Sequence, residues 1–347
     1  MTEPVAPAPD TSPTLPDPAP ARPPSAPSLF RFNLAGRQAP ALFVGGWLGI
    51  VAGMGLALVG LLSGTGLAAG ALLLVGFGLL SAGLILLGGS QAIERRAAGE
   101  PYPGPSPVLL FLVIVVVTLF VAGIVGSILE LFGVRLDKPI GDLLSVALQA
   151  AVFVGVVRLL VVGTGAIGWS EMGLRSKPGS AVSGLVTGAA FALPVVFLTG
   201  IVAYVLVQIV GQTPPSPLPP TGTAAGLGLH LVAGAGIAPF AEEVVFRGAA
   251  LTAWLRTVGP SQAIVRSAIL FSAAHALGIT GQSFGQAFGL AVVASVARLP
   301  VALALGWIYV RTGSLWSSIG LHAAFNAILI AVSESGLAAP EALAFWG

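Results

Sequence analysis

The sequence predicts an all-α integral membrane protein, a polytopic bundle of about eight or nine transmembrane helices behind a disordered, proline-rich N-terminal tail. Of the 347 residues, 56% are hydrophobic and only 8% are charged, and the mean hydropathy is +0.97. Because a soluble domain carries about 25% charged residues, much of this surface must face lipid. Apolar stretches near or above the roughly 20 residues that a bilayer requires recur along the chain.

The first half of the chain is predicted to be a tail followed by a scaffold of transmembrane helices. Residues 1–35 are rich in proline and alanine, and they lack the basic start and apolar core of a signal peptide. The scaffold, residues 36–167, holds four apolar stretches with few polar side chains: Ala41–Leu62, Leu67–Leu87, Val108–Leu129 and Leu143–Val162. We expect these to be the first four transmembrane helices.

The second half, residues 168–335, is predicted to be the catalytic membrane domain, followed by a short tail at 336–347. Its five apolar stretches are Val182–Val210, Ala225–Arg256, Ser261–Leu277, Phe284–Arg311 and Leu315–Val332. Arg298 and Pro300 interrupt the fourth of these stretches, and we expect a kink or break there because proline lacks the N–H that a helix interior needs. Nine helices result, with eight as the main alternative.

Basic residues are distributed unevenly among the predicted loops. With the N-terminus inside, the outer loops carry only Arg135 and Lys138. The inner segments carry Arg22, Arg31, Arg37, Arg95, Arg96, Arg175, Lys177, Arg256 and Arg311. The positive-inside rule therefore predicts a cytoplasmic N-terminus. The composition, rich in Ala, Gly, Leu and Val, is typical of a bacterial chain, so we expect a bacterial plasma membrane; a net charge of +2 gives no indication of nucleic-acid binding.

Two adjacent carboxylates and an arginine lie inside the sixth apolar stretch. An ionised side chain at membrane depth costs several kcal/mol unless it is paired or solvated. Glu243 and Arg247 are four residues apart and can pair across one helical turn, which is also compatible with a purely structural role. Glu242 points about 100° away from Glu243 and has no local partner. Glu242 is therefore the first candidate for a general base or acid.

Two histidines accompany these carboxylates on later helices. Phe271 and His275 lie one turn apart, as do His322 and Asn326. At 1.5 Å per residue from the inner helix ends, Glu242 and His275 lie about 21 Å deep and His322 about 13 Å deep, which is compatible with one shared site. A single histidine could simply bond one helix to another. Three helices that each carry such groups favour a functional site.

Two kinds of chemistry fit these side chains. In the first, Glu242 takes a proton from a water molecule that His275 helps to hold, while His322 and Asn326 donate to the oxyanion of a peptide bond under hydrolysis. In the second, His275, His322 and a glutamate such as Glu242 bind a divalent metal, for example zinc. The residues themselves do not choose between the two.

The sequence lacks the motifs of several other proteases, and two other functions remain as alternatives to peptide hydrolysis. The chain has no cysteine, and it lacks the H-E-x-x-H, G-x-S-G and G-x-G-D patterns of other proteases. A non-catalytic immunity or scaffold protein is one alternative. A proton-coupled transporter that uses the Glu and His residues as a relay is another, although the sequence shows no convincing internal repeat.

Three motifs carry a family resemblance. E-E-V-V-F-R at Glu242–Arg247, F-S-A-A-H at Phe271–His275 and H-A-A-F-N at His322–Asn326 resemble the E-E-x-x-x-R, F-x-x-x-H and H-x-x-x-N motifs of the CPBP family. This is the family of type II CAAX prenyl endopeptidases and bacteriocin-processing or immunity proteins. With similar flanking segments, the resemblance runs from about Gly168 to Val332.

The resemblance implies an all-helical intramembrane protease acting on a membrane-associated protein or peptide in the lipid bilayer. It implies that Glu242 activates water together with His275, and that His322 and Asn326 stabilise the oxyanion. It places Glu243 and Arg247 in the same catalytic motif as Glu242. It leaves the metal and the substrate open, since family members have been described both as metalloproteases and as glutamate proteases.

Overall fold

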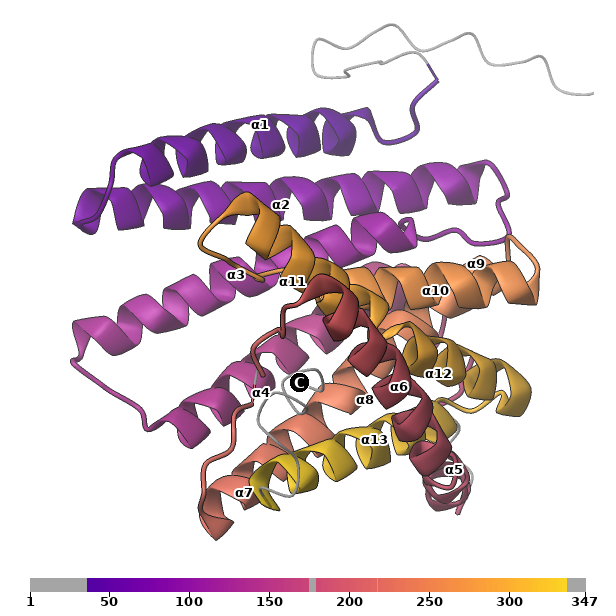
Figure 1. Cartoon of the computed structure of the whole chain (residues 1–347). Helices are drawn as coiled ribbons and strands as arrows, with labels where there is room; N and C mark the ends of the chain where they lie inside the picture. The colour runs from indigo at the N-terminus through magenta and orange to yellow at the C-terminus, as the bar shows by residue number, and fades with distance from the viewer. Residues whose placement is uncertain (1–35, 175–178, 217, 336–347) are drawn as a thin grey trace, which may run out of the picture.

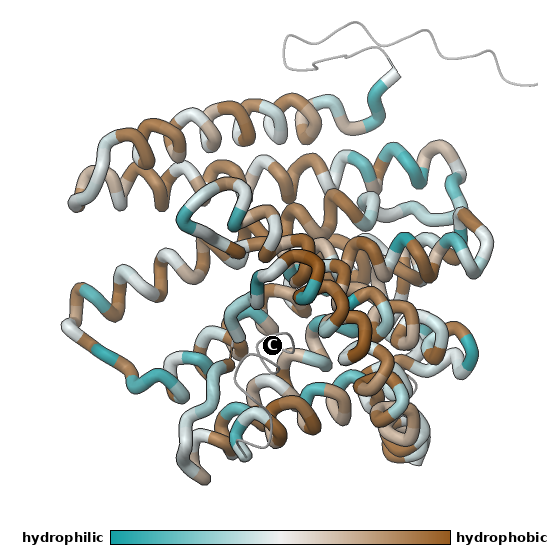
Figure 2. Tube along the Cα trace, viewed as in Figure 1, coloured by the Kyte–Doolittle hydropathy of each residue, from teal (hydrophilic) through white to brown (hydrophobic). Residues whose placement is uncertain are grey.

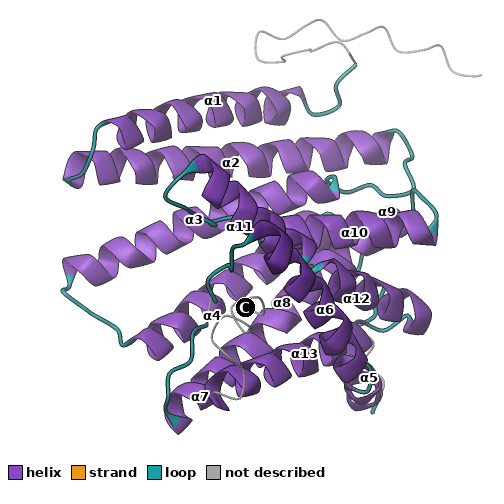
Figure 3. Cartoon of the chain, viewed as in Figure 1, coloured by secondary structure: helices purple, strands orange, loops and turns teal. Residues whose placement is uncertain are grey.

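The computed structural model describes residues 36–174, 179–216 and 218–335. The predicted tails at 1–35 and 336–347, together with Arg175 and Lys177 of the predicted inner loop, lie outside these residues. Every regular element within the described ranges is a helix (Figure 3). Eight of the described helical segments are long and apolar enough to cross a membrane. The all-α membrane bundle is therefore confirmed, with the smaller of the two predicted helix counts.

Four long helices make up the first half: α1 (Pro40–Leu62), α2 (Leu67–Ala97), α3 (Pro107–Leu131) and α4 (Lys138–Val157), which the π-helical segment η1 (Arg158–Val162) continues. Helices α1 to α3 lie side by side in a layer (Figure 1). Glycines let α1 approach α2 closely, since a Cβ atom at Gly53 would lie 2.5 Å from the backbone nitrogen of Leu80. Hydrophobic residues predominate along α1 (Figure 2), and many of them, such as Leu48, Val51 and Met54, are exposed, as expected of a lipid-facing surface.

The second half folds around one long interrupted segment, Ala224–Leu255. This segment consists of α7 (Ala224–His230), the π-helical η2 (Leu231–Ile237), α8 (Ala238–Glu243), the π-helical η3 (Val244–Leu251) and α9 (Thr252–Leu255). Around it stand α5 (Ser180–Ala189), α6 (Ala192–Val210), α10 (Pro260–Ala274), α11 (Phe284–Val296), α12 (Leu299–Thr312) and α13 (Leu315–Ser335). Arg247, Phe246 and Leu251 are among the largest fully buried side chains, so the segment runs through the core.

Two of the nine predicted spans are corrected. The predicted span Ser261–Leu277 is α10, whose 15 residues extend about 22 Å and fall short of a hydrocarbon core of roughly 30 Å. The predicted span Val182–Val210 is divided into the short α5 and the spanning α6. The break expected at Arg298 is confirmed, because α11 ends at Val296 and α12 begins at Leu299 with a proline in its first turn.

Candidate active site

A cavity of about 660 Å³ lies between the two halves of the bundle, and four of the six predicted site residues line it: Glu242, His275, His322 and Asn326. These residues come from α8, the end of α10 and α13. Helices α3 and α4 of the first half contribute Phe111, Gln149 and Phe153 to the wall. The other two predicted residues, Glu243 and Arg247, lie behind the cavity in the core. The sequence-predicted constellation is thus brought together in one place.

Glu243 and Arg247 form the ion pair that their spacing predicts. Arg247 Nη1 donates to Glu243 Oε1 over 2.9 Å, and both side chains have an exposed fraction of 0%. Arg247 Nη2 donates to the carbonyl oxygen of Ala302 on α12 over 3.0 Å, and Ser318 on α13 donates to Glu243 Oε2. Two neighbouring helices are therefore tied to the carboxylate motif. Since a buried charge is tolerated when it is paired and hydrogen-bonded, these contacts account for the burial of both residues.

His322 lies between the two glutamates. Its Nδ1 is 2.8 Å from Glu243 Oε1, and its Nε2 is 3.8 Å from Glu242 Oε2. A carboxylate that already receives the guanidinium of Arg247 can only accept, so Nδ1 of His322 carries the proton and donates to Glu243. The other nitrogen, Nε2, faces Glu242. His322 can therefore donate from Nε2 only as an imidazolium, a condition that the sequence did not reveal.

Glu242 lines the cavity, and one of its carboxylate oxygens lacks a hydrogen bond. Its Oε2 is buried and has no hydrogen-bond partner among the described residues, while the side chain as a whole is 17% exposed. The predicted lack of a partner on its own helix is confirmed, because the ionic contact within 4.0 Å comes from His322 on α13. Buried polar atoms are almost always satisfied. Because Glu242 also lines the cavity, its incompletely bonded carboxylate is suited to a water molecule or a substrate.

Phe271 holds both histidines in place. Its ring centroid lies 4.6 Å from that of His275 and 5.7 Å from that of His322, and the guanidinium carbon of Arg247 stands 4.6 Å from the same centroid. His275 follows the last residue of α10, where carbonyl groups lack helical partners. Its Nδ1 lies 2.8 Å from the carbonyl oxygen of Phe271 and must donate to it. Nε2 of neutral His275 is left as an acceptor.

Asn326 is anchored to the π-helical segment η2. Its Nδ2 donates to the carbonyl oxygen of Gly234 over 2.7 Å. In a π-helix this carbonyl would be paired with the N–H five residues later, but that residue is Pro239, which has none. Asn326 replaces the missing donor. One of its two N–H groups is thus used, and the second is available to a bound molecule.

The three candidate metal ligands, Glu242, His275 and His322, are not arranged as a metal site. Within the described ranges no group of three or more His, Asp or Glu side chains is placed to hold a metal ion. The Nδ1 atoms of both histidines bond oxygens of the protein, which leaves only their Nε2 atoms for any other ligand. These residues do not fit a bound metal in the arrangement they adopt here, and no step below is routed through one.

Arg298 is a cavity residue whose role sequence reasoning missed. We expected it only to break a helix, yet it lines the cavity together with Glu242 and His275. The signal was present, because an arginine at membrane depth calls for a functional explanation just as a glutamate does. Ser318, which bonds Glu243, gave no such signal, since serine is common where membrane helices pack.

Comparison with known proteins addresses this same region. Residues 224–328 match the family model described as type II CAAX prenyl endopeptidase Rce1-like. No curated protein and no solved structure matches the chain. The matched segment is narrower than the resemblance from Gly168 to Val332, but it contains all six predicted site residues. The family supports intramembrane peptide hydrolysis by an integral membrane protein with a protein substrate in the bilayer. Residues 224–328 are thus similar to the Rce1-like type II CAAX prenyl endopeptidases, in agreement with the CPBP resemblance that the three sequence motifs carry.

Proposed function

We propose that this chain is an intramembrane endopeptidase in which Glu242 is the general base. The observation that carries the proposal is that Glu242 lines the cavity and that its Oε2 atom has no hydrogen-bond partner among the described residues. His275 lines the same cavity, with Nε2 as an acceptor. A carboxylate and an imidazole nitrogen that both accept can orient one water molecule between them by taking both of its protons as hydrogen bonds.

The hydrolysis proceeds in two steps. Glu242 takes a proton from the water as the water oxygen forms a bond to the peptide carbonyl carbon, and the carbonyl oxygen becomes an oxyanion. The protonated Glu242 then gives this proton to the amide nitrogen as the C–N bond breaks, which releases an amine and a carboxylic acid. The same residue thus serves as base and then as acid. The rate increase over the same reaction in solution comes from holding the water molecule and the carbonyl carbon together in a site of low polarity.

His322 and Asn326 are proposed to stabilise the oxyanion. Asn326 can donate its second amide proton, since Gly234 uses only one. His322 can donate from Nε2 when it is an imidazolium, since its Nδ1 proton goes to Glu243. Glu243 and Arg247 are positioning residues in this scheme, because they act through the orientation of His322.

The cavity wall indicates the substrate class. Apolar side chains, among them Val146, Phe325 and Leu329, line most of the cavity beyond the polar residues of the site. A wall of this kind favours an apolar peptide segment or a lipid-modified one over a charged chain. We therefore propose a membrane-associated protein substrate whose scissile bond lies beside apolar groups.

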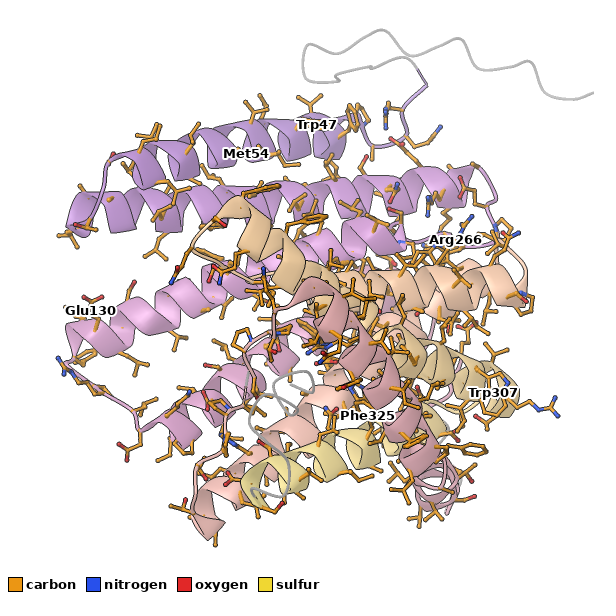
Figure 4. The ribbon with its side chains drawn as sticks, in the orientation of Figure 1. Trp47, Met54, Glu130, Arg266, Trp307 and Phe325 are labelled. Atoms are coloured by element: carbon orange, nitrogen blue, oxygen red, sulfur yellow. The ribbon has the colours of Figure 1, made fainter. Side chains whose placement is uncertain are left out.

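The test compares protein termini in membranes from strains that carry the natural chain, Glu242→Gln or a control. Glu130→Gln is the matched control, since Glu130 is exposed near the end of α3 (Figure 4). New termini should appear with the natural chain and the control but not with Glu242→Gln, because loss of a general base costs about 10²–10⁴-fold in rate. Identical terminus profiles in all three strains would refute the proposal in favour of a scaffold role. Proton flux in liposomes without any peptidase activity would instead support the transporter.

A further inference from the structure

The break between α11 and α12 contains Arg298, a cationic residue that lines the cavity of the candidate active site. Arg298 occupies the two-residue gap between Val296 and Leu299, and its Nη1 donates to the carbonyl oxygen of Ala294 over 2.7 Å. That single bond fixes the guanidinium against the end of α11. A guanidinium carries five N–H donors in a rigid fork, so several remain for other partners.

Arg298 differs in charge from its surroundings. Of the described residues that line the cavity, it is the only arginine or lysine. Arg298 and Glu242 both line the cavity, yet the two do not form one of the direct ion pairs in the described part of the chain. Arg247, by contrast, is in direct contact with Glu243. One cavity thus has in its wall a carboxylate with an oxygen that lacks a hydrogen bond and a guanidinium that is not paired with it.

The other donors at the cavity are already partly committed. Asn326 uses one amide proton on Gly234, and the Nδ1 proton of His322 goes to Glu243. The oxyanion of a tetrahedral intermediate bears close to a full negative charge and is best stabilised by preorganised, charged donors in a site of low polarity. Arg298 is half-buried and lines the cavity, so its charge can stabilise an anion that forms there during the reaction.

We propose that Arg298 is a further catalytic residue, which donates a charge-assisted hydrogen bond to the oxyanion formed when Glu242 delivers water to the peptide carbonyl. The inference rests on the proposed function. Arg298 keeps its own protons throughout. As the C–O bond to water forms, the carbonyl electron pair moves to the oxygen beside the guanidinium, and it returns to re-form the carbonyl group when the C–N bond breaks. No other reactant is required.

The experiment measures kcat and KM of the purified full-length chain in liposomes, using a fluorogenic peptide made from a cut site found in the terminus comparison. Arg298→Gln should lower kcat by about 10²–10³-fold, the usual effect of removing one oxyanion donor, and leave KM within about threefold. Arg298→Lys should recover part of the rate. The control is Arg311→Gln, which changes an exposed arginine near the end of α12 and should leave kcat unchanged.

Chemical rescue separates catalysis from a structural role. Added guanidinium ion should raise kcat of Arg298→Ala several-fold without affecting Arg311→Ala, because the cavity can admit the free ion where the side chain has been removed. A kcat for Arg298→Gln within threefold of the natural chain would overturn the inference, as would a loss that neither lysine nor guanidinium restores. If Glu242→Gln is fully active as well, the proposed function itself fails; if only Glu242→Gln is inactive, the inference about Arg298 fails alone.

Discussion

The close crossing of α5 and α13 predicts that one added methyl group will disturb the site at a distance. A Cβ atom at Gly188 would lie 1.9 Å from the carbonyl oxygen of Ser317 and 2.5 Å from the backbone nitrogen of Leu321. Both atoms belong to the backbone of α13, so no side-chain rotation relieves the contact. Gly188→Ala must therefore push the two helices apart.

The size of this displacement follows from the contact distances. Real Cβ contacts are essentially never shorter than 3.0 Å, so the helices must separate by about 1 Å at Gly188. His322 follows Leu321 on α13, and its Nδ1 stands 2.8 Å from Glu243 Oε1. If α13 moves by that amount, this distance leaves the hydrogen-bonding range of about 2.7–3.2 Å. Misplacement of a catalytic group by 1 Å can cost about 10²-fold in rate, and overpacking costs about 1–3 kcal/mol in stability.

Peptidase kcat and thermal unfolding in detergent measure these effects. The matched control is Gly126→Ala on α3, where an added Cβ has no atom within 4 Å. We expect Gly188→Ala to lower kcat by about 10²-fold and to unfold at a lower temperature, while Gly126→Ala matches the natural chain. Full activity of Gly188→Ala at an unchanged unfolding temperature would refute the reasoning, because it would show that α5 yields without moving α13.

Two further predictions concern the buried ion pair and the metal question. Arg247→Met should destabilise the protein by about 3–5 kcal/mol, since it leaves Glu243 buried without its cation. The double variant Glu243→Gln, Arg247→Met should recover most of that loss. Unfolding in mixed micelles measures the stability of both variants, and equal stability of the two would contradict the pairing argument. Incubation with 1,10-phenanthroline should leave kcat within about twofold, because Glu242, His275 and His322 are not arranged as ligands; inactivation that zinc reverses would show that the site reorganises around a metal.

The sequence allowed several features of the site to be predicted because they depend on spacing along one helix. The pairing of Glu243 with Arg247 follows from four residues of helical rise. Glu242 and His275 line one cavity, which agrees with the shared site predicted by counting residues along apolar stretches. The helix break at Arg298 follows from the nearby proline. Each of these inferences needs only the geometry of a single helix, which a sequence specifies well.

The length of α10 was harder to predict from the apolar pattern. The stretch Ser261–Leu277 is apolar enough for a transmembrane helix, but α10 ends at Ala274, where the backbone N–H of His275 bonds the carbonyl of Ser272 rather than that of Phe271. This tighter last turn leaves the Phe271 carbonyl free for the imidazole of His275. The helix end is thus set by a side chain that belongs to the site, and hydropathy does not register such a contact.

The proton positions at His322 and Asn326 lay beyond the sequence because they depend on contacts between helices. Composition and spacing suggested two equivalent oxyanion donors on one face of α13. The structure makes them different: His322 gives its Nδ1 proton to Glu243 on α8, whereas Asn326 fills the place of a backbone N–H that Pro239 lacks. Each therefore offers one fewer donor than its residue type suggests. A site with this shortage needs a further donor for the oxyanion, which is why Arg298 becomes significant only when the helices are seen together.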